Sequence, residues 1–132
     1  MITSFSIADD IECANDDVQV IDSDTIDICN IRVRLNGISA AEKGHVTFDI
    51  CKKIVKNIIK KHPIILCSLS GEKTYNRDVG TCYVKSQDQK INLQELIVGY
   101  GCARDCKRYS KGKYLDFETD ESKLLPLPGY CR

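Results

Sequence analysis

The chain has 132 residues, of which 19 are basic and 19 acidic, so its formal net charge at neutral pH is zero. This length suits one domain with a single hydrophobic core, and no stretch approaches the ~18 consecutive apolar residues that a membrane-spanning helix requires. The zero net charge argues against a uniformly basic nucleic-acid-binding domain.

Acidic residues are concentrated in the first quarter of the chain. Residues 1–30 hold eight aspartates and glutamates and no lysine or arginine, so residues 31–132 carry 19 bases against 11 acids. An acidic segment suits a divalent cation and a basic body suits phosphate, but a solvated acidic tail beside an ordinary mixed surface has the same composition. Residues 1–17 also lack periodicity, which predicts a flexible lead-in or a loosely held edge segment before a domain at residues 18–132.

Short β-prone runs follow at residues 18–21, 25–28 and 31–35, separated by DSD and CN. Such closely spaced runs predict antiparallel strands joined by tight turns. Residues 45–61 then predict an amphipathic helix ended by Pro63, because apolar residues recur at i, i+3, i+4, i+7 and i+8. These apolar positions are Cys51, Ile54, Val55, Ile58 and Ile59.

The second half of the chain predicts strands at residues 64–69 and 79–84, joined by the polar loop SGEKTYNRD. Residues 93–98 predict a short helix with Asn92 as its N-cap. This order indicates a mainly β fold with helices (α+β), a five-stranded Greek-key barrel of the oligonucleotide-binding type with two or three helices. The proline-containing tail at residues 104–132 is expected to be extended.

The eight cysteines predict a disulfide framework formed in an oxidising compartment. Zinc fits the sequence less well, because no two cysteines form a CxxC pair. Some of the cysteines can also be buried thiols of a cytoplasmic protein. Cys67 and Cys82 lie on neighbouring predicted strands and can pair across them, and Cys106 and Cys131 can tie back the tail.

Three stretches contain the candidate chemical groups: DSDT at 22–25, RVRLNGISAAE at 32–42 and TYNRDVGTCYV at 74–84. Together with INLQELIVGYGCAR at 91–104, they resemble the staphylococcal nuclease (thermonuclease) family. The family signature is roughly D-G-D-T, then R-L-x-x-I-D-x-P-E, then Y-G-R. The resemblance covers the chain from about Val18 to Arg104 and implies the barrel fold of that family.

The resemblance implies hydrolysis of phosphodiester bonds in DNA or RNA, in single strands or other accessible regions, with one Ca²⁺ ion. By position, Asp24 is a metal carboxylate with Asp22 beside it, Arg34 and Arg77 hold the phosphate, and Glu42 orients or deprotonates the attacking water. Hard oxygen ligands suit Ca²⁺, and guanidinium N–H groups suit phosphate oxygens.

The candidate substrate-binding residues are Tyr75, Arg104 and Tyr109. Arg104 and Tyr109 belong to a basic stretch at residues 104–113 that can provide phosphate contacts and a surface for base stacking. The same stretch can equally be a solvated rim. Likewise, taken singly, Asp22 and Asp24 are ordinary turn residues, and it is their order together with the other motifs that marks a site.

The departures from the family signature fall at the metal site. The second metal aspartate of the family is Ser39 here, which can donate an oxygen but has no charge, and the following proline is Ala41. Because calcium affinity depends on the charge of its ligands, weakened metal binding is expected. The turn glycine of the family is Ser23, which adds strain if that turn needs a positive φ.

Two functions therefore follow from the sequence. The first is a metal-dependent nuclease weakened at Ser39, and the second is an inactive relative that binds nucleic acid or a protein partner; a secreted module unrelated to nucleic acid is a third possibility. The motifs at 99–114 and 125–131 resemble bacterial secreted and exopolysaccharide-associated members of the family. Secretion or a periplasmic location is expected, although the first residues lack a secretory signal and a cytoplasmic location stays open.

Overall fold

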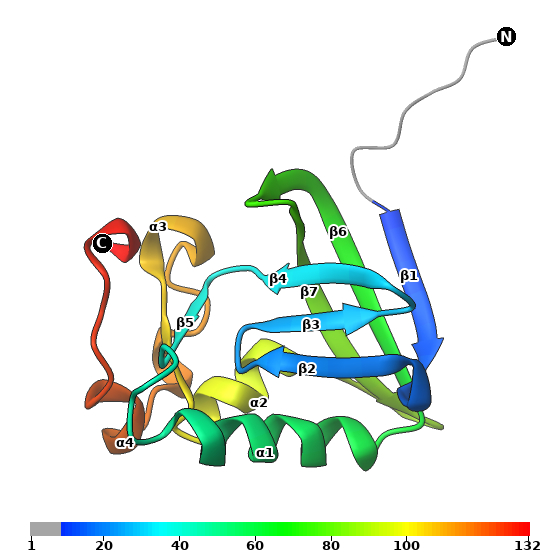
Figure 1. The fold of residues 1–132 in the computed structure, drawn as a ribbon, viewed down its shortest axis with the longest axis horizontal. Helices are drawn as coiled ribbons and strands as arrows, with labels where there is room; N and C mark the ends of the chain where they lie inside the picture. The colour runs from blue at the N-terminus through cyan, green and yellow to red at the C-terminus, as the bar shows by residue number, and fades with distance from the viewer. Residues whose placement is uncertain (1–8) are drawn as a thin grey trace, which may run out of the picture.

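The computed structural model of the protein describes residues 9–132, so residues 1–8 of the predicted acidic segment lie outside the described part. The fold combines α-helices with a larger share of β-strands (Figure 1). The strands are β1 (Asp9–Ala14), β2 (Val18–Asp22), β3 (Thr25–Ile28), β4 (Ile31–Leu35), β5 (Ile38–Ala40), β6 (Ile64–Thr74), β7 (Arg77–Ser86), β8 (Gln89–Asn92) and β9 (Ala103–Asp105). The helices are α1 (Phe48–Lys60), α2 (Leu93–Gly99), α3 (Lys107–Ser110) and α4 (Asp120–Lys123).

Seven of the strands form one sheet in the order β1-β6-β7-β4-β3-β2, with β8 paired to β7. All of these pairs are antiparallel except β4 and β7, which run parallel from Val33↔Asp78 to Leu35↔Gly80. The short strands β5 and β9 form a separate two-stranded sheet. Among the described residues the pairing runs from β1 to β2 without closing on itself, so the closed five-stranded barrel stays a prediction.

The five predicted strands are present, and two of the hairpins have two-residue turns. Cys29 and Asn30 join β3 to β4 with φ values of 47° and 68°, and Tyr75 and Asn76 join β6 to β7 with φ values of 47° and 65°. Two successive positive φ values fit the twist of a two-residue hairpin. The polar loop predicted at residues 70–78 is therefore too long, because only residues 75 and 76 form the turn and the rest belong to β6 and β7.

Helix α1 covers the sheet next to β2, as its apolar periodicity predicts (Figure 1). Its inward face consists of Cys51, Val55, Ile58 and Ile59, which are buried in the main core. They belong to the same core as fully buried strand residues such as Ile26, Val33 and Val84. No helix in the described part of the chain is long and apolar enough to cross a membrane.

The second predicted helix is confirmed as α2, and its predicted cap is present: the Asn92 side chain accepts a hydrogen bond of 3.0 Å from the backbone N–H of Glu95. The extended tail is only partly correct. Residues 106–131 include the one-turn helices α3 and α4 and 3₁₀ turns at Leu115–Phe117 and Gly129–Cys131. Tyr114 and Leu125 are buried in this segment, so the tail gains enough apolar contact to fold back.

The acidic segment at residues 1–17 contains an edge strand where the structure describes it. Strand β1 pairs with β6 from Asp9↔Leu69 to Ala14↔Ile64. A disulfide from Cys13 to Cys29 also ties this strand to the β3–β4 turn. Residues 9–14 are therefore a covalently held edge of the sheet rather than a flexible lead-in.

All eight cysteines form disulfides: Cys13–Cys29, Cys51–Cys102, Cys67–Cys82 and Cys106–Cys131. The last two are the pairs considered from the sequence. Cys67 lies directly opposite Cys82 in the β6–β7 register. The Cys106–Cys131 bond joins α3 to the C-terminal turn and so fixes the end of the chain beside the candidate site.

Candidate functional site

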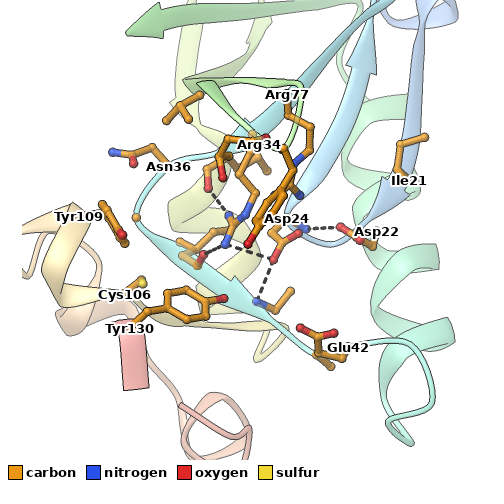
Figure 2. A pocket seen from close by; sticks show the side chains of 18 of the residues that line it. Ile21, Asp22, Asp24, Arg34, Asn36, Glu42, Arg77, Cys106, Tyr109 and Tyr130 are labelled. Carbon is orange, nitrogen blue, oxygen red and sulfur yellow. Dashed lines mark hydrogen bonds and ion pairs between the residues drawn. The ribbon is translucent and has the colours of Figure 1, made fainter. Parts of the chain in front are cut away.

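A groove of about 1030 Å³ lies where the β2–β3 turn, the β4–β5 segment, the β6–β7 hairpin and the C-terminal turn meet (Figure 2). It brings together seven of the nine residues predicted for catalysis, metal binding and substrate binding. These are Asp22, Asp24, Arg34, Glu42, Tyr75, Arg77 and Tyr109. The groove therefore unites the separate motifs of the sequence in one cavity.

Asp22 ends β2 and Asp24 lies in the turn between β2 and β3, beside an irregularity in the strand register between Val20 and Asp22. The backbone N–H of Asp24 donates to Oδ1 of Asp22 at 3.2 Å, which holds the turn closed. Ser23 is buried and is not among the described residues with positive φ. The strain expected from replacing the family glycine therefore does not arise.

Asp24 is held by contacts from three directions. Its Oδ2 lies 3.5 Å from Nη2 of Arg34 and accepts a hydrogen bond of 3.3 Å from the N–H of Ala40. Its Oδ1 accepts a hydrogen bond of 3.1 Å from the Thr25 hydroxyl. Burial acts to raise the pKa of Asp24, but the charge of Arg34 and these hydrogen bonds outweigh it and hold the pKa below its ordinary value. Asp24 is thus an ionised carboxylate.

Arg34 reaches the groove from β4, and only 15% of its side chain is exposed. Besides pairing with Asp24, its guanidinium donates to the carbonyl oxygens of Leu35 and Ile38, the latter at 2.8 Å. These bonds orient a nearly buried cation at the floor of the groove. A cation held in this way is suited to binding an anion without reorganising.

Arg77 approaches the same space from the start of β7 (Figure 2). Its contacts are weak: Nε donates to the Thr74 carbonyl at 3.2 Å, and Nη1 donates to the Thr25 hydroxyl at 3.4 Å. Its guanidinium also lies 5.9 Å from the centre of the exposed Tyr75 ring. Because the partners of Arg77 are neutral, the guanidinium keeps an unmatched charge facing the groove.

Glu42 and Ser39 have different positions relative to the groove. Glu42 is exposed beyond the end of β5, and its carboxylate faces the groove below Asp24 (Figure 2). Ser39 is 4% exposed and is not among the residues that line the groove. Its place in β5 opposite Arg104 of β9 explains this, since alternate residues of a strand face opposite sides.

Arg104 also lies outside the groove. Its Nε is 3.4 Å from a carboxylate oxygen of Glu118, and its Nη1 donates to the Leu125 carbonyl at 3.5 Å. The structure thus gives Arg104 a role in holding the tail. By contrast, Tyr109 is half-exposed and lines the groove as expected.

Sequence reasoning missed several charged or aromatic lining residues, among them Lys43, Lys52, Glu72, Lys73 and Tyr130. Tyr130 is brought in by the disulfide of its neighbour Cys131, so the cysteine pairing was the available signal. Lys73 was within the stretch taken for a loop, and Lys52 lies on the polar side of α1. With these residues the groove has five basic and four acidic side chains along its walls.

The floor of the groove is fixed from behind by Gln94, which is fully buried. Its side-chain amide donates to the carbonyls of Asn36 and Gly80, both at 3.2 Å, and its oxygen accepts from the N–H of Cys82. Next to Asn36, Gly37 has φ +82°, and an added Cβ would meet the Ser110 Cβ at 2.9 Å. The β4–β5 connection therefore has one tightly constrained path.

Of the four carboxylates that line the groove, those of Asp22 and Asp24 are the ones predicted to bind a divalent cation. In the described part of the chain no group of three or more histidine, cysteine, aspartate or glutamate side chains is arranged to hold a metal. Ca²⁺ takes six to eight oxygen ligands, whereas Mg²⁺ keeps several waters and uses one or two carboxylates plus substrate phosphates. The donor set thus fits a hydrated cation and does not form a calcium site built wholly from protein oxygens.

Asp22 gives a pH-dependent prediction. Burial, together with the neighbouring Asp24 carboxylate, raises the pKa of Asp22 to about 6 from 3.8. The folded chain therefore binds this proton more tightly than the unfolded chain, and stability falls as pH rises from about 4 to about 6. Asp22→Asn is expected to raise the free energy of unfolding by about 1 kcal/mol at pH 8, a value discounted for solvent screening of the half-buried group, and by much less at pH 4.

Urea unfolding of both proteins at the two pH values measures this effect. Asp16→Asn, at an exposed position of the acidic segment, is a matched control. An equal gain from Asp22→Asn at pH 4 and pH 8 would show that the carboxylate charge is not its source.

Comparison with known proteins gives one partial similarity. No family model matches the chain. It is 30% identical over 105 residues to the succinoglycan biosynthesis protein ExoI of Rhizobium meliloti, a match that covers 72% of this chain and 53% of that protein. The chain thus spans about half the length of the curated relative it matches.

Proposed function

We propose that this chain is a nuclease of the staphylococcal nuclease type, which hydrolyses phosphodiester bonds of DNA or RNA in the groove with the help of a divalent cation. One observation carries the proposal: Asp24, Arg34, Glu42 and Arg77 come from four separate segments and line the same groove. Arginines can stabilise the charge that develops on phosphate, an ionised carboxylate can help to hold a cation, and a free carboxylate can act as a general base, so this set suits phosphodiester hydrolysis.

Each group has a role that its environment supports. Arg34 and Arg77 would donate N–H groups to the phosphate oxygens and offset the charge that develops on them. Exposed Glu42 would accept a proton from the attacking water, for which it needs access to solvent. A cation held by Asp24 and Asp22 would supply Lewis acidity and lower the pKa of bound water.

The finer fold assignment belongs to the same proposal. The strands β2-β3-β4-β7-β6 lie side by side in the sheet in that order. We assign these five strands to the barrel of the oligonucleotide-binding type, with β1 added at the free edge of β6. The position of the groove, over the β2–β3 turn and one end of β4, supports this assignment.

The test is cleavage of fluorescent single-stranded DNA and RNA with Ca²⁺, Mg²⁺, Mn²⁺ or a chelator. Wild-type protein is expected to cleave only with added metal, and Glu42→Gln should lower the rate by about 100-fold or more. Glu72→Gln, which also removes a carboxylate from the groove wall, is the matched control and should change the rate little. Cleavage that is unchanged by Glu42→Gln would rule out the assigned base.

A catalytically inactive module that binds nucleic acid or a protein partner is the second candidate. It is favoured by the position of Ser39 outside the groove and by the contacts that already occupy Asp24. The name of the similar relative refers to polysaccharide biosynthesis and not to nucleic-acid cleavage. Nucleic-acid binding at low salt with no cleavage in any metal would select this candidate.

An exported location fits either candidate. All eight cysteines are paired, and disulfides persist mainly in oxidising compartments such as the periplasm or the cell exterior. Fractionation of the native host, followed by thiol labelling of the protein, would test this. Eight free thiols in the native protein would argue for the cytoplasm.

A further inference from the structure

A second cavity of about 650 Å³ lies between strand β2 and helix α1. Its helix wall includes Lys52, Lys56 and Lys60. Lys52 and Ile21 line both this cavity and the candidate groove, so the two hollows adjoin. Figure 1 shows α1 running alongside β2, which makes the second cavity a continuation of the groove along the helix.

The three lysines form one row because residues four apart lie on the same face of an α-helix, ~6 Å apart along its axis. We call Lys52, Lys56 and Lys60 the lysine row. None of the three takes part in an ion pair within the described residues. The acidic residue that lines this cavity is Asp16 on the opposite wall, and Asp49 lies in the first turn of α1.

A row of three positive charges against a single acidic wall residue favours an anionic ligand. Lys56 and Lys60 are exposed, so their ammonium groups can reach a ligand without unfolding the helix. Equal spacing along the axis suits a polymer with a repeated anionic group better than a compact anion. A phosphodiester strand that continues beyond the groove has this chemistry.

We propose that the lysine row binds the backbone of a single nucleic-acid strand where it leaves the groove. The inference rests on the proposed function, because it assumes that the groove holds one phosphodiester. It adds that the binding site is longer than the groove and that the strand leaves past Lys52 along α1. Longer strands should therefore bind more tightly than short ones, with a steeper dependence on salt.

The experiment measures binding by fluorescence anisotropy in the presence of chelator, so that no cleavage occurs. The probes are fluorescein-labelled oligothymidylates of about four and about sixteen nucleotides. The test variant is Lys56→Gln/Lys60→Gln. The matched control is Lys53→Gln/Lys61→Gln, which removes the same charge from α1 and its C-cap at positions that line neither cavity.

The test variant is expected to bind the longer probe several-fold more weakly, with a salt slope reduced by about 1.4. It should bind the short probe like wild type, and the control variant should bind both probes like wild type. If the two variants weaken binding equally, the loss of positive charge alone explains the effect, and the proposal for the lysine row is wrong. No weakening by the test variant would overturn it as well.

Arg77→Gln separates this inference from the proposed function. If Arg77→Gln weakens the short probe but Lys56→Gln/Lys60→Gln leaves the longer probe unaffected, the groove binds nucleic acid and the lysine row does not. If wild type binds neither probe in chelator but cleaves DNA or RNA with added metal, the lysine row fails and the proposed function stands. If wild type neither binds nor cleaves, both proposals fail. If the protein binds polyglutamate and not the oligonucleotides, and Lys56→Gln/Lys60→Gln weakens that binding, the lysine row binds an acidic protein and the proposal is wrong.

Discussion

Arg34→Gln should lower the free energy of unfolding by about 3 kcal/mol at pH 7, because it removes the charge partner of a nearly buried carboxylate. Asp24 and Arg34 have side-chain exposures of only 17% and 15%, so water can replace the lost guanidinium only in part. The carbonyls of Leu35 and Ile38 also lose their donor. Urea unfolding at equilibrium measures the loss.

The matched control for this prediction is Arg32→Gln, two residues away on the same strand. Arg32 pairs with Asp27 at 2.8 Å, but its side chain is half exposed, so solvent screens the pair and little stability should be lost. The double variant Arg34→Gln/Asp24→Asn should regain most of the lost stability, because it leaves no unpaired charge. Equal losses for Arg34→Gln with and without Asp24→Asn would show that the ion pair is not the cause.

The pH dependence of Arg34→Gln has a definite sign. In wild type the pKa of Asp24 lies below its ordinary value of 3.8, so its contribution to stability is present above about pH 4 and is lost as pH falls through the lowered pKa. Without Arg34, burial would raise the pKa of Asp24 above 3.8. The stability deficit of Arg34→Gln should therefore be larger at pH 7 than at pH 4.

The same variant tests the role of Arg34 in binding. If the guanidinium holds phosphate, Arg34→Gln should weaken binding of the short oligothymidylate even when the protein is fully folded. The variant Arg34→Gln/Asp24→Asn restores stability without restoring that donor. Binding that recovers together with stability would assign Arg34 a purely structural role.

Local patterns predicted the elements that depend on local interactions. The runs that became β2, β3 and β4 and the apolar stripe of α1 are visible because each buries one face against the core. Asn92 was recognisable as a cap because it directly precedes the apolar run of the helix, where its side-chain oxygen can accept a hydrogen bond from a free N–H group of the first turn. The four chain segments that form the site could also be predicted from their motifs, but the distances between their side chains could not.

The missed features depend on contacts between distant segments. Strand β9 pairs only with β5, and the short runs that form them carry no signal of their own. Ser39 faces away from the groove because β5 pairs with β9. The sequence around Ser39 does not reveal that pairing, so the orientation of its side chain could not be predicted. The tail looked extended because its prolines were visible, whereas burial of Tyr114 and Leu125 depends on the rest of the fold.

Removing the disulfide between Cys51 and Cys102 should have the largest effect on stability. This bond links α1 to the segment after α2 across 51 residues, with the Cα atoms 5.4 Å apart. In the chain-entropy model a loop of that length contributes about 4 kcal/mol to the free energy of unfolding. Cys51→Ala/Cys102→Ala should lose about that amount in urea unfolding at equilibrium.

Cys13→Ala/Cys29→Ala is the comparison that removes a disulfide with a shorter loop that does not involve α1. Cys29 is exposed, so this variant also loses less buried sulfur. Its bond spans 16 residues and should contribute about 3 kcal/mol in the same model. Only the longer bond fixes α1, and Cys51 is next to Lys52, which lines both cavities. Loss of the Cys51–Cys102 bond should therefore weaken binding of the longer oligothymidylate as well as stability, whereas loss of the Cys13–Cys29 bond should affect stability alone. A Cys51→Ala/Cys102→Ala variant that is folded and binds the longer probe like wild type would mean that apolar packing is sufficient to position α1.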